Sequence, residues 1–528
     1  MSVYDVIIRN GIVVDGSGAP PFKRDLGVIG DTIAKVGDLS GCVAEEVIHV
    51  DGLVVAPGFI DIHNHSDGGI FILPTADNYV TQGVTTVVIG NCGYSLAPLT
   101  DKNREFIELS EVGFVKELGR LPWASFRDYL ESLDRLEKSL NVATLIGHGT
   151  VRSAVLGTDS LKPTRRELEE MKGLVAEALR NGAFGMSSGL IYVPGVFSET
   201  LELIELAKIL SRYGGVYATH IRNEGVEFMD ALIEALEVGL KSNVGLEISH
   251  IKAAGPPAWG GVTMALSIIE EYVRRGYDVS ADVYPYAASS TGLEALLPSW
   301  VREGGLEGLL SKLSDVEALE RLKKDLAKYG IPEERHADWD KVRVSYTEKH
   351  PEALGRSIEE ISRLWGVDPV QTIAKMLIDD RGLTGVVIHS MNEDDVSKAV
   401  AHPLVAIGSD GSVRKLGEGT PHPRNYGCFP RLIAKYVRGL KILSLPEAVR
   451  KMTSLPARKI GLFDRGLVRP GFKADLTIFN YYMIRDKATY ENPHEYSTGV
   501  EYLLVNGKFV IRDGRHTLAK PGRLLRSV

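Results

Sequence analysis

The sequence of 528 residues predicts an α/β protein. We expect a (β/α)₈, TIM-like barrel, a small β-sandwich domain built from both termini, and a lid-like insertion near the barrel mouth. Two observations predict this fold. Apolar strand-like runs alternate with amphipathic helical stretches through the middle of the chain, and both ends carry short strands separated by turn dipeptides. Such alternation is typical of a parallel sheet covered by helices, and a large barrel accounts for a length well above the ~100–200 residues of one ordinary domain.

The two ends of the chain are predicted to form the β-sandwich. Near the N-terminus, Asn10-Gly11 and Gly30-Asp31 separate short apolar runs, and near the C-terminus Asn506-Gly507 does the same. Asn-Gly in particular favours a two-residue hairpin turn. We therefore assign residues 1–56 and 461–528 to one β-domain.

The barrel is assigned to residues 57–460. Nine segments have strand character for eight places, so at least one of them does not belong to the barrel. A helix between two of them has clear boundaries, because Thr164 with Glu167 forms a capping box and Gly182 is a good helix stop. The nine segments are Phe59–His63, Thr85–Ile89, Ala143–Gly147, Phe184–Ser187, Gly215–Thr219, Gly245–Ser249, Val279–Val283, Gly385–His389 and Leu404–Gly408.

The alternation breaks at about residues 286–345, where the chain is helical and charged. We interpret this stretch as an insertion near the barrel mouth, with a lid as one role. Its start, Leu293–Trp300, is mostly apolar and contains no arginine. If it lines the side-chain pocket, apolar substrate side chains are preferred over acidic ones. Leu296, Leu297 and Trp300 could equally pack the insertion onto the barrel, and Glu294 could meet a basic side chain.

Composition excludes several classes of protein. Hydrophobic residues make up 44% and charged residues 25%, and the net charge of −8 includes no basic block that would favour nucleic acid. The sequence contains no run of ~18 apolar residues for a membrane span, and the first residues do not resemble a signal peptide. The three cysteines, Cys42, Cys92 and Cys428, are too few for a disulfide framework and fit a reducing cytoplasm. Nothing in the sequence specifies an oligomeric state.

The first chemical signal is a pair of histidines, His63 and His65, at the end of an apolar run. Side chains in a strand alternate with period two, so both imidazoles point to the same side. Such a pair alone is explained as well by ordinary core or surface histidines as by a metal. Its position at the C-terminal end of a barrel strand strengthens the metal interpretation.

Four more polar residues end other apolar strands: Cys92, His220, His250 and Asp410. Taken singly, a buried cysteine is more often an inert apolar side chain, and a strand-end histidine or aspartate is often a hydrogen-bonded core residue. Together with the two histidines they supply the imidazole, thiolate and carboxylate ligands that zinc prefers. One barrel mouth can gather them despite their separation in sequence.

These motifs resemble a known family. Pro57-Gly58-Phe59-Ile60-Asp61-Ile62-His63-Asn64-His65 resembles the first-strand motif of the metal-dependent amidohydrolase superfamily. Many members bridge two metals with a carbamylated lysine on the fourth strand, and the expected fourth strand here has none. The resemblance to the D-aminoacylases, or N-acyl-D-amino-acid deacylases, runs from about residue 3 to about residue 526. It rests on Gly90-Asn91-Cys92-Gly93, Thr219-His220-Ile221-Arg222, Ser249-His250-Ile251-Lys252, Gly408-Ser409-Asp410-Gly411, Thr420-Pro421-His422-Pro423-Arg424 and Met452-Thr453-Ser454-Leu455-Pro456-Ala457-Arg458.

The resemblance implies zinc-dependent hydrolysis of a small-molecule substrate, the amide bond of an N-acyl-D-amino acid. It assigns Asp410 as the general base that takes a proton from water and then donates one to the leaving amine. The ligands it implies are Cys92, His220 and His250 for a tightly bound zinc, and His63, His65 and Asp410 for a second, weaker metal site.

The resemblance also implies that Lys252, Tyr284 and Arg424 hold the substrate carboxylate, with Tyr192 and Ser290 as weaker matches. Without it, each of these five would be interpreted as an exposed or helix-capping polar residue. Three other residues attract no such role. His148 either touches substrate or supports the site by a hydrogen bond, His389 has no assigned role, and Cys428 is expected to pack in the core.

Two alternative functions are considered. A cyclic-amide hydrolase of the dihydroorotase or hydantoinase type needs a bridging lysine, which we cannot place in this sequence. A non-catalytic scaffold on the same fold is disfavoured because all six ligand-type positions are filled.

Overall fold

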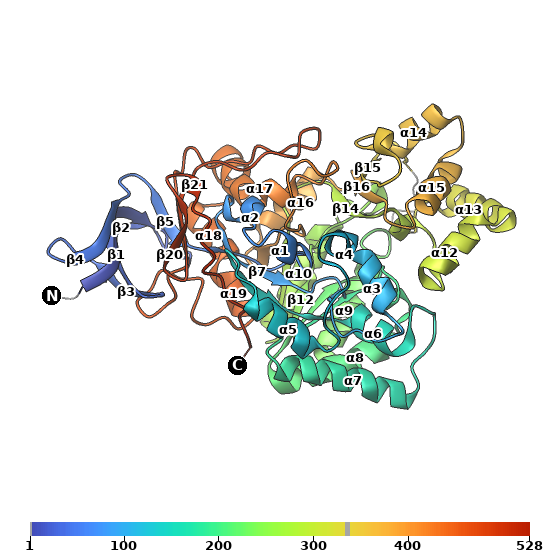
Figure 1. Ribbon diagram of the computed structural model, residues 1–528, viewed down its shortest axis with the longest axis horizontal. Coiled ribbons are helices and arrows are strands. Elements are labelled where there is room, and N and C mark those ends of the chain that lie inside the picture. The colour runs from blue at the N-terminus through green and yellow to red at the C-terminus, as the bar shows by residue number, and fades with distance from the viewer. Residues whose placement is uncertain (1–2, 333–337, 528) are drawn as a thin grey trace.

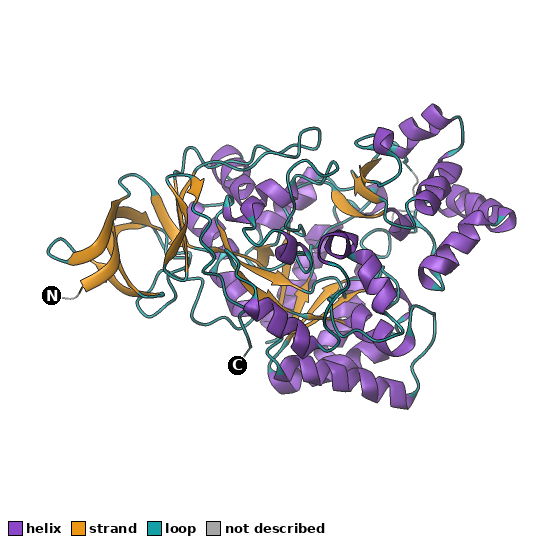
Figure 2. Ribbon diagram, viewed as in Figure 1, coloured by secondary structure: helices purple, strands orange, loops and turns teal. Residues whose placement is uncertain are grey.

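The computed structural model describes residues 3–332 and 338–527. The protein has a mixed α/β fold with three regions along its length (Figure 1). Strands from both chain ends lie at one end, parallel strands surrounded by helices form the middle, and the segment around residues 289–388 projects at the other end (Figure 2). The functional side chains discussed below lie in the middle region.

Both termini build one sheet, which contains nine strands among the described residues. Its order is β21-β20-β19-β18-β5-β1-β2-β3, with β4 paired to β1. The antiparallel pairing of β5 with β18 joins the two ends of the chain. The strands are β1 (Val3–Val13), β2 (Phe22–Ile29), β3 (Thr32–Gly37), β4 (Val43–His49), β5 (Val54–Pro57), β18 (Leu476–Phe479), β19 (Val500–Val505), β20 (Lys508–Arg512) and β21 (Arg515–His516).

Two of the three expected hairpin turns are confirmed. Gly30-Asp31 joins β2 to β3, and Asn506-Gly507 joins β19 to β20 with both residues at positive φ. The turn expected at Asn10-Gly11 is wrong, because β1 runs straight through it. The pairing of β1 with β2 shifts register there, so the dipeptide forms a β-bulge instead.

The middle of the chain supplies the parallel strands. One sheet has the order β6-β7-β8 and another β17-β13-β12-β11-β10-β9. Only Leu145 separates β8 from β9, and a parallel bridge joins Asn64, after β6, to Gly411, after β17. The strands are β6 (Phe59–Asp61), β7 (Val84–Ile89), β8 (Asn141–Thr144), β9 (Ile146–Gly147), β10 (Gly185–Gly189), β11 (Val216–His220), β12 (Gly245–Ile248), β13 (Val279–Val283) and β17 (Val405–Ile407).

Helices pack around these strands, and the expected capping box of α7 is present, with Thr164 accepting from the Glu167 amide. The helices of this region are α1 (Gly69–Ile72), α2 (Asp77–Val80), α3 (Arg104–Ser110), α4 (Val112–Leu118), α5 (Phe126–Arg135), α6 (His148–Leu156), α7 (Arg165–Arg180), α8 (Thr200–Tyr213), α9 (Phe228–Ser242), α10 (Gly261–Arg274), α16 (Glu393–Ala401), α17 (Arg424–Arg431), α18 (Leu445–Met452) and α19 (Ser454–Lys459). No helix among the described residues is both long and apolar enough to cross a bilayer.

The inserted segment has its own sheet and its own apolar core. Its strands lie in the order β14-β16-β15, and its buried leucines, isoleucines and valines form a separate cluster. The segment therefore extends to residue 388, beyond the expected end near residue 345, and its residues 333–337 lie outside the described structure. Its elements are β14 (Ser289–Gly292), α11 (Ser299–Arg302), α12 (Gly305–Ser314), α13 (Val316–Tyr329), β15 (Val342–Tyr346), α14 (Ile358–Trp365), α15 (Pro369–Asp379) and β16 (Gly385–Ile388).

The strand β16 explains the surplus among the nine expected strands. The sequence signal for Gly385–His389 was correct as a strand, but β16 pairs antiparallel with β14 and β15 rather than with the parallel strands. A short apolar run indicates a buried strand without indicating which sheet contains it.

Candidate metal centre and active site

The six expected metal ligands come together, although they span almost 350 residues of sequence. Each follows or ends a parallel strand: His63 and His65 follow β6, Cys92 follows β7, His220 ends β11, His250 follows β12, and Asp410 follows β17. These strands belong to two sheets that the bridge between Asn64 and Gly411 links, and their carboxyl ends lie together, which explains the convergence. Donor atoms of Cys92, His220 and His250 lie within 4.8 Å of one another, as do those of His63, His65, Cys92 and Asp410.

Cys92 is the residue that both groups share. Its Sγ atom lies 3.3 Å from Nε2 of His63, 3.3 Å from Nε2 of His250 and 3.8 Å from Nδ1 of His220. Burial opposes ionisation of the thiol, but the neighbouring His63 and His250 outweigh it and lower the pKa of Cys92 well below its ordinary 9.0. The site therefore favours a thiolate, which is the form that binds zinc.

Asp410 lies between the histidines of the second group of donors and Arg424. Its Oδ1 atom is 3.0 Å from Nε2 of His65 and 3.5 Å from Nε2 of His63, and its Oδ2 atom is 2.8 Å from Nη1 of Arg424. Burial alone would raise the pKa of this carboxyl, but Arg424, His250 and the hydrogen bond with His65 lower it well below 3.8. Asp410 is therefore an ionised carboxylate that can accept a proton.

Three of these residues have an uncommon backbone conformation. Cys92, His250 and Asp410 have φ values of 51°, 35° and 51°, in the left-handed region that side chains other than glycine rarely adopt. Such strain costs ~1–3 kcal/mol per residue and clusters at functional sites. It sits here at the strand ends, where it directs three donor groups toward one point.

Glu224 holds the two histidines from behind, and sequence reasoning missed it. Its carboxylate lies 3.5 Å from Nε2 of His220, 3.0 Å from Nδ1 of His250 and 2.7 Å from Nζ of Lys252. Burial would raise its pKa, but His220, Lys252 and His250 outweigh burial and lower it. A carboxylate that contacts the distal nitrogen of a ligating histidine fixes the orientation of the ring. The only sequence signal was an acidic residue four positions after His220.

Asp282 also supports two of the metal-ligand residues, His250 and His63. It accepts from the His250 amide at 3.0 Å and lies 3.3 Å from Nδ1 of His63. Its position inside the buried strand β13 was a signal, because an ionisable residue in an apolar strand is rarely present without a partner.

The five residues expected to bind substrate surround the same point, though not equally. Arg424, the first residue of α17, pairs with Asp410 and donates from Nη2 to the carbonyl of Ser290 at 3.2 Å. The ring of Tyr284 lies 4.8 Å from the Arg424 guanidinium and 5.7 Å from Nζ of Lys252. The hydroxyl of Tyr192 accepts from Thr291 at 3.2 Å, and its ring lies 5.1 Å from that of His220. Ser290 lines the cavity, and its backbone carbonyl accepts the hydrogen bond from Arg424.

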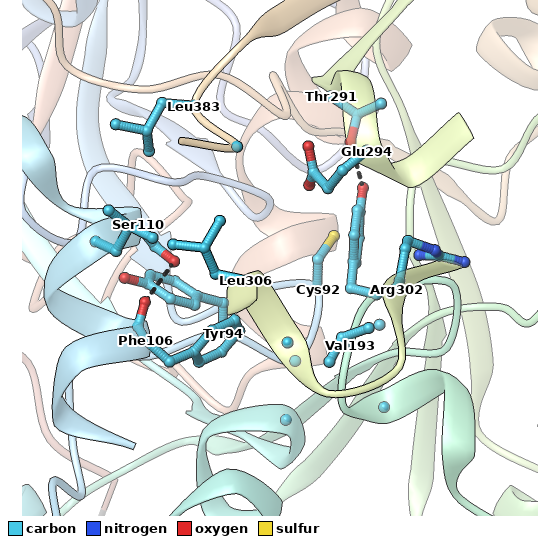
Figure 3. A pocket seen from close by; sticks show the side chains of 18 of the residues that line it. Cys92, Tyr94, Phe106, Ser110, Val193, Thr291, Glu294, Arg302, Leu306 and Leu383 are labelled. Atoms are coloured by element: carbon cyan, nitrogen blue, oxygen red, sulfur yellow. Dashed lines mark hydrogen bonds between the residues drawn. The ribbon is translucent and has the colours of Figure 1, made fainter. Parts of the chain in front are cut away.

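A cavity of ≈ 390 Å³ opens over Cys92 and Asp410 and is lined by Tyr192, Ser290 and Arg424. Lys252 and Tyr284 are buried behind it and do not line it. Figure 3 shows Arg302 to the right of Cys92, Thr291 and Glu294 above it, Tyr94, Phe106, Ser110 and Leu306 to its left, and Leu383 to its upper left. Burial raises the pKa of Glu294 to about 7, although Arg302 attenuates the effect. The cavity wall thus combines a carboxyl that titrates near neutrality with an apolar region.

The expectation that the apolar residues of Leu293–Trp300 line the pocket for the substrate side chain is not supported. Leu296 and Leu297 are buried in the core of the insertion, and Trp300 packs against that core. Only Glu294 of this run lines the cavity. The apolar residues of the run are therefore packing residues, because the insertion has a core of its own to fill.

The three residues without an assigned role behave as structural residues. His148 is buried and its Nε2 lies 2.8 Å from Glu202, which supports the hydrogen-bonding interpretation rather than substrate contact. His389 lies beside Tyr490, with ring centroids 4.7 Å apart. Cys428 is buried beside the carbonyl of Gly408, as expected for packing.

The donor set fits a zinc ion. Cys92, His220 and His250 supply one thiolate and two imidazoles, a combination that zinc binds at catalytic sites while leaving a position open. Supporting carboxylates contact the histidines from outside, as at other metal sites. The expected fourth strand, β10, reads Gly-Met-Ser-Ser-Gly and offers no lysine to bridge two metals.

Comparison with known proteins agrees with this geometry. The chain matches the amidohydrolase family over residues 46–303 and 312–511. It is 35% identical to a D-aminoacylase of Alcaligenes xylosoxydans xylosoxydans over 99% of this chain and 97% of the relative. It is also 35% identical to an N-acyl-D-glutamate deacylase of the same organism, over 99% and 96% of the two chains. The chain therefore belongs to the amidohydrolase family and, within it, to the D-aminoacylases.

Solved structures show the same relationship. A D-aminoacylase with a binuclear metal centre superposes with a TM-score of 0.85 at 36% identity, covering 99% of this chain and 100% of that one. An N-acyl-D-glutamate deacylase of Bordetella bronchiseptica, complexed with zinc and a phosphonate inhibitor, gives a TM-score of 0.85 at 32% identity with the same coverage. The resemblance expected from the sequence motifs is confirmed.

Proposed function

We propose that the protein hydrolyses the amide bond of N-acyl-D-amino acids, releasing a carboxylate and a free D-amino acid. The observation that carries the proposal is the arrangement around Cys92, where a thiol and two histidines face a common point beside an ionised aspartate. Full-length similarity to two deacylases of N-acyl-D-amino acids supports this substrate class.

Cys92, His220 and His250 would hold one zinc tightly, and His63, His65 and Asp410 would form a weaker second site. Zinc bound there would polarise the substrate carbonyl and make a water molecule more acidic. We expect the second site to bind metal more weakly for two reasons. None of His63, His65 and Asp410 supplies a thiolate, and the Asp410 carboxylate is already paired with Arg424.

Asp410 is the proposed proton carrier. It is ionised, buried, and within hydrogen-bond distance of the histidines, so it can take a proton from the attacking water. The same carboxyl would then protonate the leaving amine. Arg424 favours the ionised form of Asp410 and so prepares it for the first step.

Lys252, Tyr284 and Arg424 are the proposed binding group for the substrate carboxylate, with Tyr192 and Ser290 at its edge. Lys252 keeps its charge despite burial, because Glu224 raises its pKa against the effect of desolvation. An arginine can hold a carboxylate through two parallel hydrogen bonds. A carboxylate anchored beside Ser290 places the α-carbon next to the metal ligands and leaves the acyl group on their other side.

The proposal includes a preference for substrates with apolar rather than acidic D-side chains, and Glu294 is the residue that supports this preference. This carboxyl lies in the cavity wall near Thr291 (Figure 3). A second carboxylate, from D-glutamate or D-aspartate, would meet like charge and a costly desolvation there.

We further propose that the parallel strands close into a (β/α)₈ barrel with the terminal sheet as a β-sandwich beside it. The bridge between Asn64 and Gly411 supports closure, because it links the first and last parallel strands. A cytoplasmic location is also proposed, supported by the free state of Cys42, Cys92 and Cys428.

The proposal is tested with a hydrolysis panel on protein stripped of metal and reloaded with zinc. The panel contains N-acetyl-D-leucine, N-acetyl-L-leucine, N-carbamoyl-D-leucine and a cyclic amide such as dihydrouracil. We expect zinc-dependent turnover of N-acetyl-D-leucine in clear excess over the other three. Faster turnover of the cyclic amide would instead support the hydantoinase-type alternative and reject the deacylase.

A further inference from the structure

The cavity has an apolar lobe that the proposed chemistry does not use. Tyr94, Phe106 and Leu109 line it from the segment after β7 and from α3, and Leu306 of α12 and Leu383 face them from the insertion. All five side chains are only half-buried. Apolar side chains that remain half-buried around a cavity beside a catalytic centre are typical of a ligand-binding wall.

The lobe lies on one defined side of the metal ligands. In Figure 3, Leu306, Tyr94 and Phe106 lie to the left of Cys92 and Leu383 to its upper left, while Thr291 and Glu294 lie above it. Thr291 belongs to β14, the strand whose Ser290 contacts Arg424. The strand that contacts Arg424 and the apolar lobe therefore approach Cys92 from different directions.

The connectivity of an amide decides which half of the substrate enters the lobe. The scissile carbonyl carbon carries nitrogen on one side and the acyl chain on the other. With the amino-acid half anchored at Arg424 and Ser290, and the carbonyl at the metal ligands, we place the acyl chain on the side of the metal ligands away from β14. That direction leads toward Tyr94, Leu306 and Leu383.

The cavity has the volume of a site that encloses a whole drug-sized ligand. At ≈ 390 Å³ it falls in the range of ~300–1,000 Å³ of sites that enclose drug-sized ligands. Gly382 lies close against Leu306, since a Cβ atom there would be 3.0 Å from the leucine Cδ1, so the loop before Leu383 and the start of α12 form one continuous wall. Arg381, which also lines the cavity, pairs with Glu307 at 3.1 Å, and both are exposed.

We propose that the preferred substrates are N-acyl-D-amino acids with a medium-length aliphatic acyl chain, rather than N-acetyl derivatives, and that Leu306 and Leu383 determine this preference. The inference rests on the proposed deacylase function and names its acyl specificity. The reaction remains a hydrolysis, in which water adds to the carbonyl, the C–N bond breaks, and a fatty acid and a free D-amino acid are released.

The test is a chain-length series of N-acetyl-, N-butanoyl-, N-hexanoyl- and N-octanoyl-D-leucine, assayed by released D-leucine below the concentration at which the longer substrates aggregate. We expect kcat/KM to rise by up to about fourfold per added methylene, and by at least about tenfold from acetyl to hexanoyl. A flat or falling series, with N-acetyl-D-leucine hydrolysed, overturns the acyl inference alone. A series in which no member is hydrolysed overturns the deacylase function as well.

Two variants locate the preference. Leu306→Ser and Leu383→Ser should each lower the hexanoyl-to-acetyl ratio of kcat/KM by several-fold, since each removes apolar contact from the lobe. Leu364→Ser is the matched control, because Leu364 is 57% exposed on α14 of the same insertion and does not line the cavity, so the ratio should not change. The assignment of the lobe is wrong if Leu306→Ser and Leu383→Ser instead change discrimination between short and long D-side chains while the acyl series stays as in the wild type.

Discussion

Glu224→Gln is the substitution that most sharply probes how the metal centre is held. One carboxylate contacts His220, His250 and Lys252, so the change weakens the support of two ligands at once. Loss of a carboxylate behind a ligating histidine typically lowers metal affinity ~10–100-fold. Because two histidines depend on Glu224, we expect the upper part of that range, or about 2–3 kcal/mol of binding free energy.

The assay is zinc competition against a chromogenic chelator, with kcat measured at low and at saturating zinc. Glu224→Gln should bind zinc more weakly and should recover much of its kcat when zinc is in excess, a recovery that general misfolding would not produce. Glu234→Gln is the control, since Glu234 pairs with Arg222 and not with the histidines. A zinc affinity for Glu224→Gln within twofold of the wild type would refute the positioning role.

Three further predictions follow from the same geometry. Cys92→Ala should lose tight zinc and activity together, which metal analysis and turnover on one preparation will show, and retention of stoichiometric zinc would contradict the ligand assignment. Asp410→Asn should lower kcat by ~10²–10⁴-fold while tight zinc remains, so a kcat within a few-fold of the wild type removes Asp410 from the mechanism. Discrimination against N-acetyl-D-glutamate relative to N-acetyl-D-leucine should grow as pH rises through about 7, because the raised pKa of Glu294 leaves it neutral below that pH and charged above it. In Glu294→Gln the ratio of kcat/KM for N-acetyl-D-leucine to that for N-acetyl-D-glutamate should no longer depend on pH. A pH dependence equal to that of the wild type would exclude Glu294 as the cause of the discrimination.

The residues of the metal centre could be predicted from the sequence because each of them follows or ends a recognisable apolar strand. His63, Cys92, His220 and Asp410 each stand at the end of a parallel strand, and a sheet of such strands brings its ends together whatever lies between them. Glu224 could not be predicted in the same way. It lies in a loop after β11, and only the folded loop turns its carboxylate back toward His250.

The incorrect predictions have a common physical cause. A local sequence pattern predicts the type of element or the burial of a side chain, but it does not identify the strand or core against which that element packs. Asn10-Gly11 suits a hairpin, but β1 pairs with β2, β4 and β5 together, and these pairings keep it extended through a bulge. Leu296 and Leu297 are apolar beside a catalytic cavity, yet the insertion has its own core and buries them there. The apolar run at β16 predicts a strand, but it does not show that this strand is the one of nine candidates that pairs outside the parallel sheets.

The most direct test of the central claim is the hydrolysis of racemic N-acetyl-leucine by zinc-loaded protein, followed to completion by chiral chromatography. The account predicts that the reaction stops when half of the substrate has been consumed, with D-leucine as the amino-acid product and N-acetyl-L-leucine left intact. Consumption of both enantiomers at similar rates, or of neither, would contradict it.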